Sequence, residues 1–318
     1  MAKRLVTVGD LVVDIVLDAV LPLHPNQHQT AKRLRFEAGG ACTTILAARK
    51  MGLDIAALGT VGDDLQGRML LDILDDAAVD TSALVIPPGS ATTTVVALSD
   101  SGQGGHVFLG HYGEGADIDF TDVAEERLDA SDAIFIPGYT LAEARLSPLV
   151  AGVCDWLAKQ GGRFYFDVGP FARHLTQAQI DQVLSLCHIL LLTEDEIPFV
   201  AEGALGLDAC RRLCAQYAQL TIALKLGAAG CRIISRDLDL VCPGFTVDVV
   251  DTVGAGDAFA SAYIWADLNG YSPRACGAIA NAMGAASVAK AGAGASVPAG
   301  ADVQSLLDRE NTGINISC

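Results

Sequence analysis

The chain has 318 residues, of which 51% are hydrophobic and 19% charged, and its formal net charge is −17. This length and composition can supply one large core, which predicts a single domain over 1–318. The acidic balance argues against nucleic acid and anionic membranes as partners. Because we find no signal-peptide pattern and no uncharged apolar run of about 18 residues, we expect a soluble, cytoplasmic protein.

Short apolar runs that end in glycine or a polar residue predict buried strands, and they alternate with stretches of helical periodicity. This alternation predicts a mostly parallel sheet with helices on both faces. The predicted strands are Leu5–Gly9, Ile55–Gly59, Ala133–Gly138, Phe164–Asp167, Ile189–Thr193 and Thr221–Gly227. The predicted helices are Thr43–Met51, Leu65–Ala78, Leu146–Gln160, Ile180–Cys187, Ala209–Tyr217 and Ala258–Leu268.

Polar residues and glycines follow several of these strands. In parallel sheets, ligands bind beyond the carboxyl ends of the strands. We therefore expect a site where these residues meet. The residues at or just past strand ends are Asp10, Asp14, Asp167, Thr193 and Gly227.

Two segments, approximately 15–37 and 90–112, break the alternation and have the pattern of β-ribbons. In the second segment, residues 92–98 and 106–109 flank a turn at 99–102, which predicts a hairpin. Both segments flank early strands of the predicted sheet. We expect them to pair into a small sheet that acts as a lid and excludes water from the site.

The segment Asp251–Phe259 reads DTVGAGDAF and precedes the predicted helix. Glycine and the free N–H groups of a helix start can bind an anion, here with Gly254, Ala255, Gly256 and Asp257. A carboxylate in such a place favours a reaction in which a hydroxyl loses its proton while negative charge develops nearby. Taken alone, the segment is explained better by turn glycines before a capped helix, so the rest of the chain decides.

Five further motifs occur in a fixed order, namely residues 39–43 (GGACT), 58–67 (LGTVGDDLQG), 193–196 (TEDE), 225–230 (KLGAAG) and 292–298 (GAGASVP). Together with Asp251–Phe259, they resemble the ribokinase-like carbohydrate kinases, the PfkB family, over nearly the whole chain. The resemblance implies a three-layer α/β/α sandwich with a mostly parallel sheet and a small β-sheet lid. It also implies ATP-dependent phosphorylation of a primary hydroxyl on a small sugar or sugar-like substrate.

The resemblance further implies roles for individual residues. Asp257 matches the general base, and the backbone amides of Gly254–Asp257 match the anion hole for the transferred γ-phosphoryl group. Glu196 matches the residue that organises Mg²⁺ through water. The remaining implied contacts are Asp14, Gly39, Gly40 and Thr43 to the sugar, Thr193, Lys225, Gly227, Gly230 and Asn281 to ATP, and Asp251, the Val253 carbonyl and Ser296 to a monovalent cation such as K⁺.

Two departures from the family pattern leave alternatives open. The family usually has Asn at the positions of Thr43 and Thr193, and Thr offers one hydroxyl where Asn offers a carbonyl and an amide. The identity of the sugar therefore stays open, and a nucleoside kinase of the same superfamily is the first alternative. A non-catalytic sugar or nucleotide sensor is the second. In some members of this family exposed lid sheets pair between subunits, so a homodimer through the lid is a further expectation.

Overall fold

The fold comes from a computed structural model that describes residues 2–100, 105–290, 292 and 296–316. The strands are β1 (Arg4–Asp18), β2 (Arg33–Gly40), β3 (Asp54–Thr60), β4 (Asp80–Val85), β5 (Thr93–Asp100), β6 (Gly105–His111), β7 (Ala133–Pro137), β8 (Arg163–Asp167), β9 (Ile189–Thr193), β10 (Thr221–Lys225), β11 (Gly230–Ile234) and β12 (Asp239–Pro243). The helices are α1 (Ala41–Lys50), α2 (Leu65–Asp76), α3 (Asp122–Asp129), α4 (Gly138–Ala142), α5 (Ser147–Gln160), α6 (Gln177–Leu186), α7 (Ile197–Val200), α8 (Gly206–Gln216), α9 (Ala255–Leu268), α10 (Pro273–Val288) and α11 (Gly300–Arg309).

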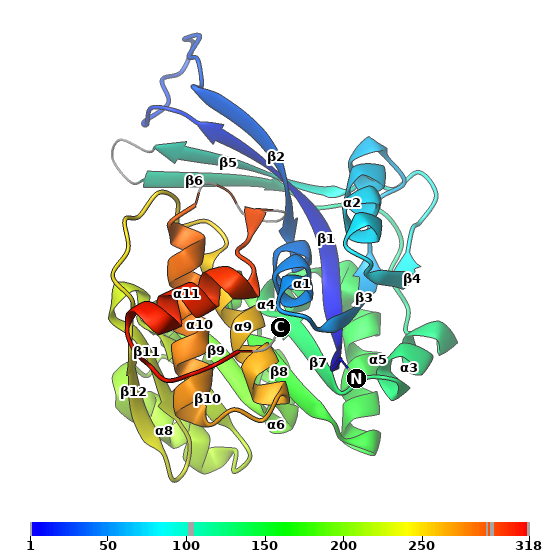
Figure 1. The fold of residues 1–318 in the computed structure, drawn as a ribbon. Helices are drawn as coiled ribbons and strands as arrows, with labels where there is room; N and C mark the ends of the chain where they lie inside the picture. Colours follow the sequence, from blue (N-terminus) through cyan, green and yellow to red (C-terminus); the bar gives the residue numbers. More distant parts are fainter. Residues whose placement is uncertain (1, 101–104, 291, 293–295, 317–318) are drawn as a thin grey trace.

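The main sheet has the strand order β12-β11-β10-β9-β8-β7-β1-β3-β4. The strands from β10 to β4 along this path pair in parallel, whereas β11 and β12 extend one edge as an antiparallel pair. Helices cover both faces, and the lid strands rise from one end of the sheet (Figure 1). The predicted three-layer α/β/α sandwich with a mostly parallel sheet and a small lid is confirmed.

Strand β1 joins the main sheet to the lid. The predicted strand Leu5–Gly9 is only its first part, because β1 continues to Asp18. Its first half lies between β3 and β7, and its second half lies between β2 and β5. The prediction that Asp10 and Asp14 follow the end of a strand is therefore wrong: both lie within β1, where it passes from the main sheet into the lid.

The lid is a four-stranded sheet in the order β2-β1-β5-β6. Strands β5 and β6 form the predicted hairpin, and Val96 pairs with Leu109. Residues 101 and 102 of its predicted turn lie outside the described residues. The carboxylate of Asp64 caps α2 by accepting the N–H of Gly67 at 2.8 Å and also accepts the N–H of Thr92 at 2.8 Å. This carboxylate thus fixes the start of β5 against the main domain.

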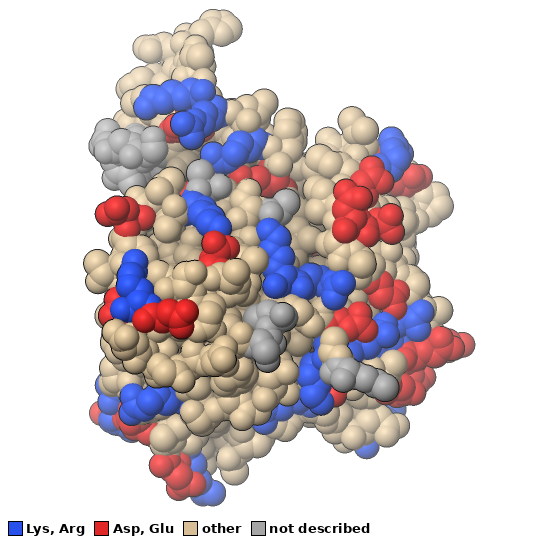
Figure 2. All heavy atoms as spheres, viewed as in Figure 1, with Lys and Arg blue, Asp and Glu red and all other residues tan. Residues whose placement is uncertain are grey.

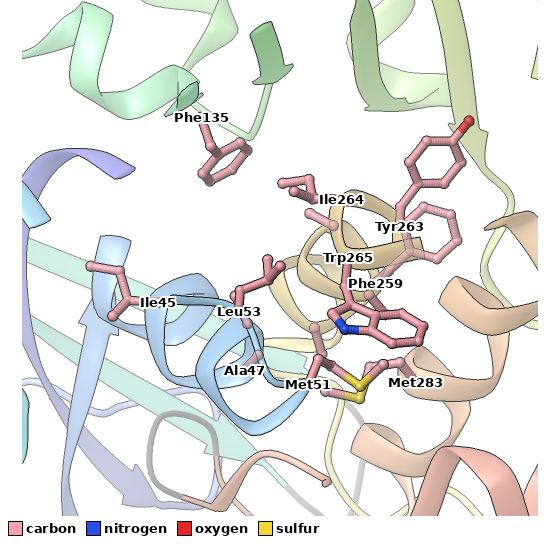
Figure 3. Close-up of a cluster of buried hydrophobic side chains, with 14 of the residues drawn as sticks. Ile45, Ala47, Met51, Leu53, Phe135, Phe259, Tyr263, Ile264, Trp265 and Met283 are labelled. Atoms are coloured by element: carbon pink, nitrogen blue, oxygen red, sulfur yellow. The ribbon is translucent and has the colours of Figure 1, made fainter. Parts of the chain in front are cut away.

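Helix α9 lies in the core and holds the Asp251–Phe259 segment in place. All residues from Ala258 to Ala266 are buried, since α9 packs against α1 and α10. Figure 3 shows Trp265 of α9 beside Met51 of α1 and Met283 of α10. A helix that is apolar on all sides is fixed by its surroundings, so its first turn has a defined position at the end of the sheet.

The charged side chains are spread over the surface. On the face shown in Figure 2, acidic side chains gather over α2, and basic side chains are prominent on the lid. No helix in the described part of the chain is long and apolar enough to cross a membrane.

Candidate active site

A cavity of about 940 Å³ lies between the lid and the carboxyl ends of the parallel strands. Its walls come from β1, the lid strands β5 and β6, the loops after β7 and β8, and the start of α9. Nine of the predicted site residues line it, namely Asp14, Gly40, Thr193, Glu196, Lys225, Val253, Gly254, Gly256 and Asp257. Eight others do not, namely Gly39, Thr43, Gly227, Gly230, Asp251, Ala255, Asn281 and Ser296.

The start of α9 supplies hydrogen-bond donors to this cavity. The helix begins at Ala255, three residues before the predicted start, and Gly254 is its N-cap with φ of 75°. Gly254 has no side chain, so the N-cap makes no side-chain hydrogen bond to the N–H groups of the first turn. Because Gly256 and Asp257 line the cavity, the positive end of the helix dipole faces it as well. This arrangement suits a bound anion.

Asp257 lies at the same helix start. The pKa of its carboxyl is raised to about 7, mainly by burial and also by the charge of Asp167, while Lys225 opposes the rise. A hydrogen bond with the side chain of Thr44 also lowers it. A carboxyl group with this pKa is ready to accept a proton near neutral pH.

The predicted contact Thr43 points elsewhere. Its hydroxyl donates to the carbonyl of Ala38 at 3.2 Å, and its exposed fraction is 2%. The next residue, Thr44, is the one that contacts Asp257. The family resemblance implied a sugar contact at Thr43, but its hydroxyl bonds to the backbone, and it is the adjacent Thr44 that lies next to Asp257.

Asp14 and the two glycines form one unit. A Cβ atom on Gly39 would lie 2.0 Å from Oδ2 of Asp14, so the missing side chain makes room for this carboxylate. Gly40, with φ of 56°, is the N-cap of α1 and lines the cavity. Burial, together with the nearby Glu37 carboxylate, raises the pKa of Asp14 to about 7. Gly39 therefore acts through Asp14, whereas Gly40 faces the cavity directly.

Lys225 is a cationic residue that lines the cavity together with Asp167 and Glu196. Its Nζ lies 2.8 and 2.9 Å from the two carboxylate oxygens of Asp167. Burial alone would lower the pKa of Lys225, but Asp167 and Glu196 raise it above the usual value. Its Nζ is 3.7 Å from the position that a Cβ atom on Gly256 would take, which places the ammonium next to the start of α9.

Glu196 interacts electrostatically with both Lys225 and Asp167. It accepts the backbone N–H of Thr193 at 2.7 Å. Burial raises its pKa, and Lys225 opposes the rise. Thr193 and Glu196 thus cap one 3₁₀ turn, Glu194–Glu196, at the end of β9 and present a carboxylate to the cavity.

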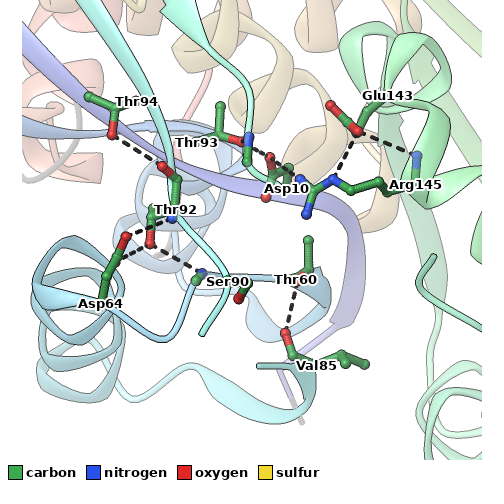
Figure 4. Close-up of polar contacts among 12 residues, drawn as sticks. Asp10, Thr60, Asp64, Val85, Ser90, Thr92, Thr93, Thr94, Glu143 and Arg145 are labelled. Atoms are coloured by element: carbon green, nitrogen blue, oxygen red, sulfur yellow. Dashed lines mark hydrogen bonds and ion pairs between the residues drawn. The ribbon is translucent and has the colours of Figure 1, made fainter. Parts of the chain in front are cut away.

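A polar network that the sequence motifs do not reveal lies on the lid side (Figure 4). The hydroxyl of Thr93 donates to Asp10 and accepts the N–H of Gly113 at 2.8 Å. Arg145 lies 3.7 Å from Asp10 and 3.1 Å from Glu143. Burial raises the pKa of Asp10 to about 6, against the effect of Thr93 and Arg145. The members come from four separate segments, so no local pattern could have identified them.

Gly230 and Asn281 stabilise the place where β11 begins and β12 ends. A Cβ atom on Gly230 would lie 2.2 Å from the Cys242 carbonyl, and its φ is 99°. The amide of Asn281 donates to the carbonyls of Cys242 and Pro243 at 3.0 Å each. Gly227 has φ of 56°, and a Cβ atom there would have nothing within 4 Å. These three residues shape the β10–β11 turn and its neighbour β12.

The expected role of Asp257 as general base predicts a pH dependence of turnover. Asp14 and Asp257 both have a pKa raised to about 7, and the charge of Asp14 is one cause of the rise at Asp257. Below pH 7 Asp257 holds its proton and cannot take another, so we expect kcat/KM to fall by about tenfold per pH unit on the acid side. Because the Asp14 charge contributes to the raised pKa of Asp257, Asp14→Asn should move this acid limb to lower pH. A profile that is flat from about pH 5 to 8 would contradict this assignment.

Comparisons with known proteins agree with the fold. The family model described as pfkB family carbohydrate kinase matches residues 2–300. An ATP-dependent ribose-1-phosphate kinase from Halopiger xanaduensis is 25% identical over 309 residues, which cover 96% of this chain and 99% of the relative. A nucleoside kinase from Methanothermobacter thermautotrophicus is 24% identical over 310 residues, covering 93% of each chain. The structure of Arabidopsis thaliana ribokinase complexed with ribose and ATP has a TM-score of 0.82 at 22% identity, and the match covers 96% of this chain and 99% of that one.

Proposed function

Because the chain belongs to the pfkB family of carbohydrate kinases, we propose that it transfers the γ-phosphoryl group of ATP to a primary hydroxyl of a small sugar or sugar-like substrate. The observation that supports this most is the start of α9, where the N-cap Gly254, Gly256 and Asp257 line one cavity. The family match over residues 2–300 further supports one catalytic domain that carries its own lid.

In the proposed reaction, Asp257 takes the proton of the acceptor hydroxyl as its oxygen bonds to the γ-phosphorus. The bond between this phosphorus and the oxygen that stays with ADP breaks. The amides at Gly254, Gly256 and Asp257, which line the cavity, stabilise the charge on the transferred group. The N–H of the fourth predicted member, Ala255, donates to the Thr252 carbonyl instead. Lys225, next to Gly256, adds a positive charge on the same side.

The acceptor is proposed to lie against β1 and the lid. Asp14 and the backbone at Gly40 offer acceptor and donor groups to its hydroxyls, and Asp10 extends this polar wall. Tyr139 lines the same cavity, and its hydroxyl is buried with no hydrogen-bond partner among the described residues.

The nucleotide is proposed to lie toward β9 and β10, near Thr193, Gly227 and Gly230. Within the described ranges, no group of three or more His, Cys, Asp or Glu side chains is arranged to hold a metal ion. We propose that Mg²⁺ arrives bound to the phosphates of ATP, and that the Glu196 carboxylate hydrogen-bonds to a water molecule on the metal. The Mg²⁺ ion would neutralise part of the phosphate charge.

Dependence on ATP also supports a cytoplasmic location. Potassium is not part of the proposal, because Asp251 is already paired with Arg35.

A nucleoside is the second candidate acceptor, favoured by an aromatic wall. The rings of Tyr112 and Phe171 meet edge to face at 5.8 Å, and His174 lies 5.9 Å from Phe171. Phe108 reaches the same cavity from the lid and is 59% exposed. Such a wall can stack against a base.

One panel of acceptor substrates distinguishes a sugar kinase from a nucleoside kinase. Purified protein is assayed for ADP formation with ATP and Mg²⁺ against pentoses, hexoses, their 1-phosphates and nucleosides. A sugar with the highest kcat/KM supports the first candidate, and a nucleoside supports the second. ATP binding without turnover of any acceptor would contradict both and favour the non-catalytic sensor.

The outer face of the lid supports a homodimer. Residues paired across four strands form two apolar rows on the face opposite Asp14 and Phe108. Their exposed members include Phe36 at 56% and Leu109 at 72%. An exposed apolar sheet face of this kind is typical of an interaction surface. The rows are Phe36, Ile15, Val96 and Leu109, and Leu34, Leu17, Leu98 and Val107.

The proposed dimer predicts the effect of a charge on this face. Phe36→Asp combined with Leu109→Asp should convert a dimer to a monomer in size-exclusion chromatography with light scattering, because each carboxylate would be desolvated in the interface. Val241→Asp, at an exposed apolar position on β12, is the matched control and should leave the dimer intact. A wild-type chain that is monomeric at all concentrations would contradict the proposal.

A further inference from the structure

Arg35 connects the lid to the segment that precedes the anion hole. It lies on β2, beside Val16 of β1, on the face of the lid that carries Asp14. Its Nε donates to Glu37 at 2.7 Å, and its Nη2 lies 3.2 Å from Oδ2 of Asp251. The side chains of Glu37 and Asp251 are only 8% and 11% exposed. A guanidinium group thus bridges two largely buried carboxylates from distant segments.

Asp251 has further partners that make it an organising residue. Its Oδ1 accepts the N–H of Val253 at 3.1 Å, and its Oδ2 accepts the N–H of Gly292 at 3.2 Å. Gly292 has φ of 95°, and a Cβ atom there would lie 2.8 Å from Oε1 of Glu37. The Arg35, Glu37 and Asp251 side chains therefore pack tightly around two loops, one of which leads directly into Gly254.

The charge of Asp251 needs compensation. It lies three residues before Gly254, so an unpaired carboxylate there would oppose the arrival of a phosphoryl group at the start of α9. Arg35 supplies the compensating charge and holds Asp251 with a fixed geometry.

These contacts do not fit the monovalent cation that the family resemblance implies at Asp251, Val253 and Ser296. A second cation on Asp251 would lie beside the guanidinium and be repelled by it, with both oxygens of Asp251 already accepting hydrogen bonds. Ser296 is exposed. Among the described residues, the place of a cation on Asp251 is taken by Arg35.

We propose that Arg35 is the built-in cation of this loop, so that the anion hole is ordered without K⁺ and turnover is independent of the monovalent cation. Arg35 is a positioning residue that acts through Asp251, and the proposal rests on the proposed kinase function. Because Arg35 is carried by the lid, the same contact couples the position of the lid to the order of the anion hole.

The test compares monovalent cations at constant ionic strength. Wild-type kcat and KM for ATP are measured in KCl, NaCl and tetramethylammonium chloride, and Tm is measured in the same salts without substrates. We expect wild-type values within about twofold in all three salts and no specific effect of K⁺ on Tm. In Arg35→Ala we expect kcat to fall by about tenfold or more, with part of it restored by KCl but not by tetramethylammonium. Arg35→Lys should retain more of kcat than Arg35→Ala, since it keeps the charge.

Arg33→Ala is the matched control, because Arg33 is an exposed arginine two residues earlier on the same strand. It should behave as wild type in every salt. A wild-type enzyme stimulated more than about tenfold by K⁺ overturns the proposal, as does an Arg35→Ala variant indistinguishable from Arg33→Ala. If no acceptor is phosphorylated in any salt, the proposed function fails. The Tm comparison still decides on Arg35, since a K⁺-specific rise in the Tm of the wild type would overturn its assignment.

Discussion

Asp257→Asn is expected to lower kcat/KM for the acceptor by about 10²–10⁴-fold while leaving ATP binding and the fold intact. The amide keeps the shape of the side chain but cannot take the proton of the acceptor hydroxyl. The assay is ADP formation under saturating ATP, with ATP binding measured separately by calorimetry. Asp119→Asn, which removes an exposed carboxylate elsewhere on the surface, is the control and should be fully active.

Asp257→Asn should also be more stable than the wild type at alkaline pH. The pKa of Asp257 in the folded protein, about 7, lies above its ordinary value of 3.8. The folded state therefore retains a proton that the unfolded state loses, and the stabilisation this gives is lost as pH rises toward 7. Asp257→Asn escapes this loss, so we expect its Tm to exceed that of the wild type by a few degrees near pH 8 and by less near pH 5. A lower Tm at pH 8 would show that the ionised carboxylate stabilises the site.

Lys225→Met should have the second large effect, because it removes one partner of a buried ion pair. Asp167 is 7% exposed and would remain as an unpaired buried charge close to Glu196 and Asp257. Loss of one partner in such a pair typically costs about 3–5 kcal/mol in the free energy of unfolding. We expect a loss of this size in urea denaturation, together with a large fall in kcat.

A double variant separates the two effects. Lys225→Met with Asp167→Asn removes both charges, so much of the lost stability should return. Activity should stay low, since the ammonium next to Gly256 is still missing. A double variant with full activity would show that Lys225 serves only to neutralise Asp167.

The sequence predicted most of the main sheet because its parallel strands are continuous apolar runs. Strand β4 was not predicted, since only one of its six residues is buried and its pattern is weak. The length of β1 was underestimated for another reason. Asp10 and Asp14 interrupt the apolar run, and a strand with carboxylates inside it is explained only by the two sheets that it joins.

The candidate site was predicted where its residues lie in local motifs. Asp257, Gly254 and Glu196 belong to such motifs and line one cavity in the structure. Contacts between distant segments could not be predicted from the sequence. The ion pair of Arg35 with Asp251 spans 216 residues, and the hydrogen bond of Thr93 with Asp10 spans 83. Neither pair has a spacing that a pattern in one chain can reveal.

The central claim is phosphoryl transfer to a hydroxyl with Asp257 as the base, and ³¹P NMR of the reaction mixture tests it most directly. Wild-type protein with ATP, Mg²⁺ and the best acceptor of the panel should give ADP and one phosphate monoester on a primary hydroxyl. Asp257→Asn at the same concentration should give neither on the same time scale. Inorganic phosphate in place of the ester, or the same ester formed at an unchanged rate by Asp257→Asn, would contradict the account.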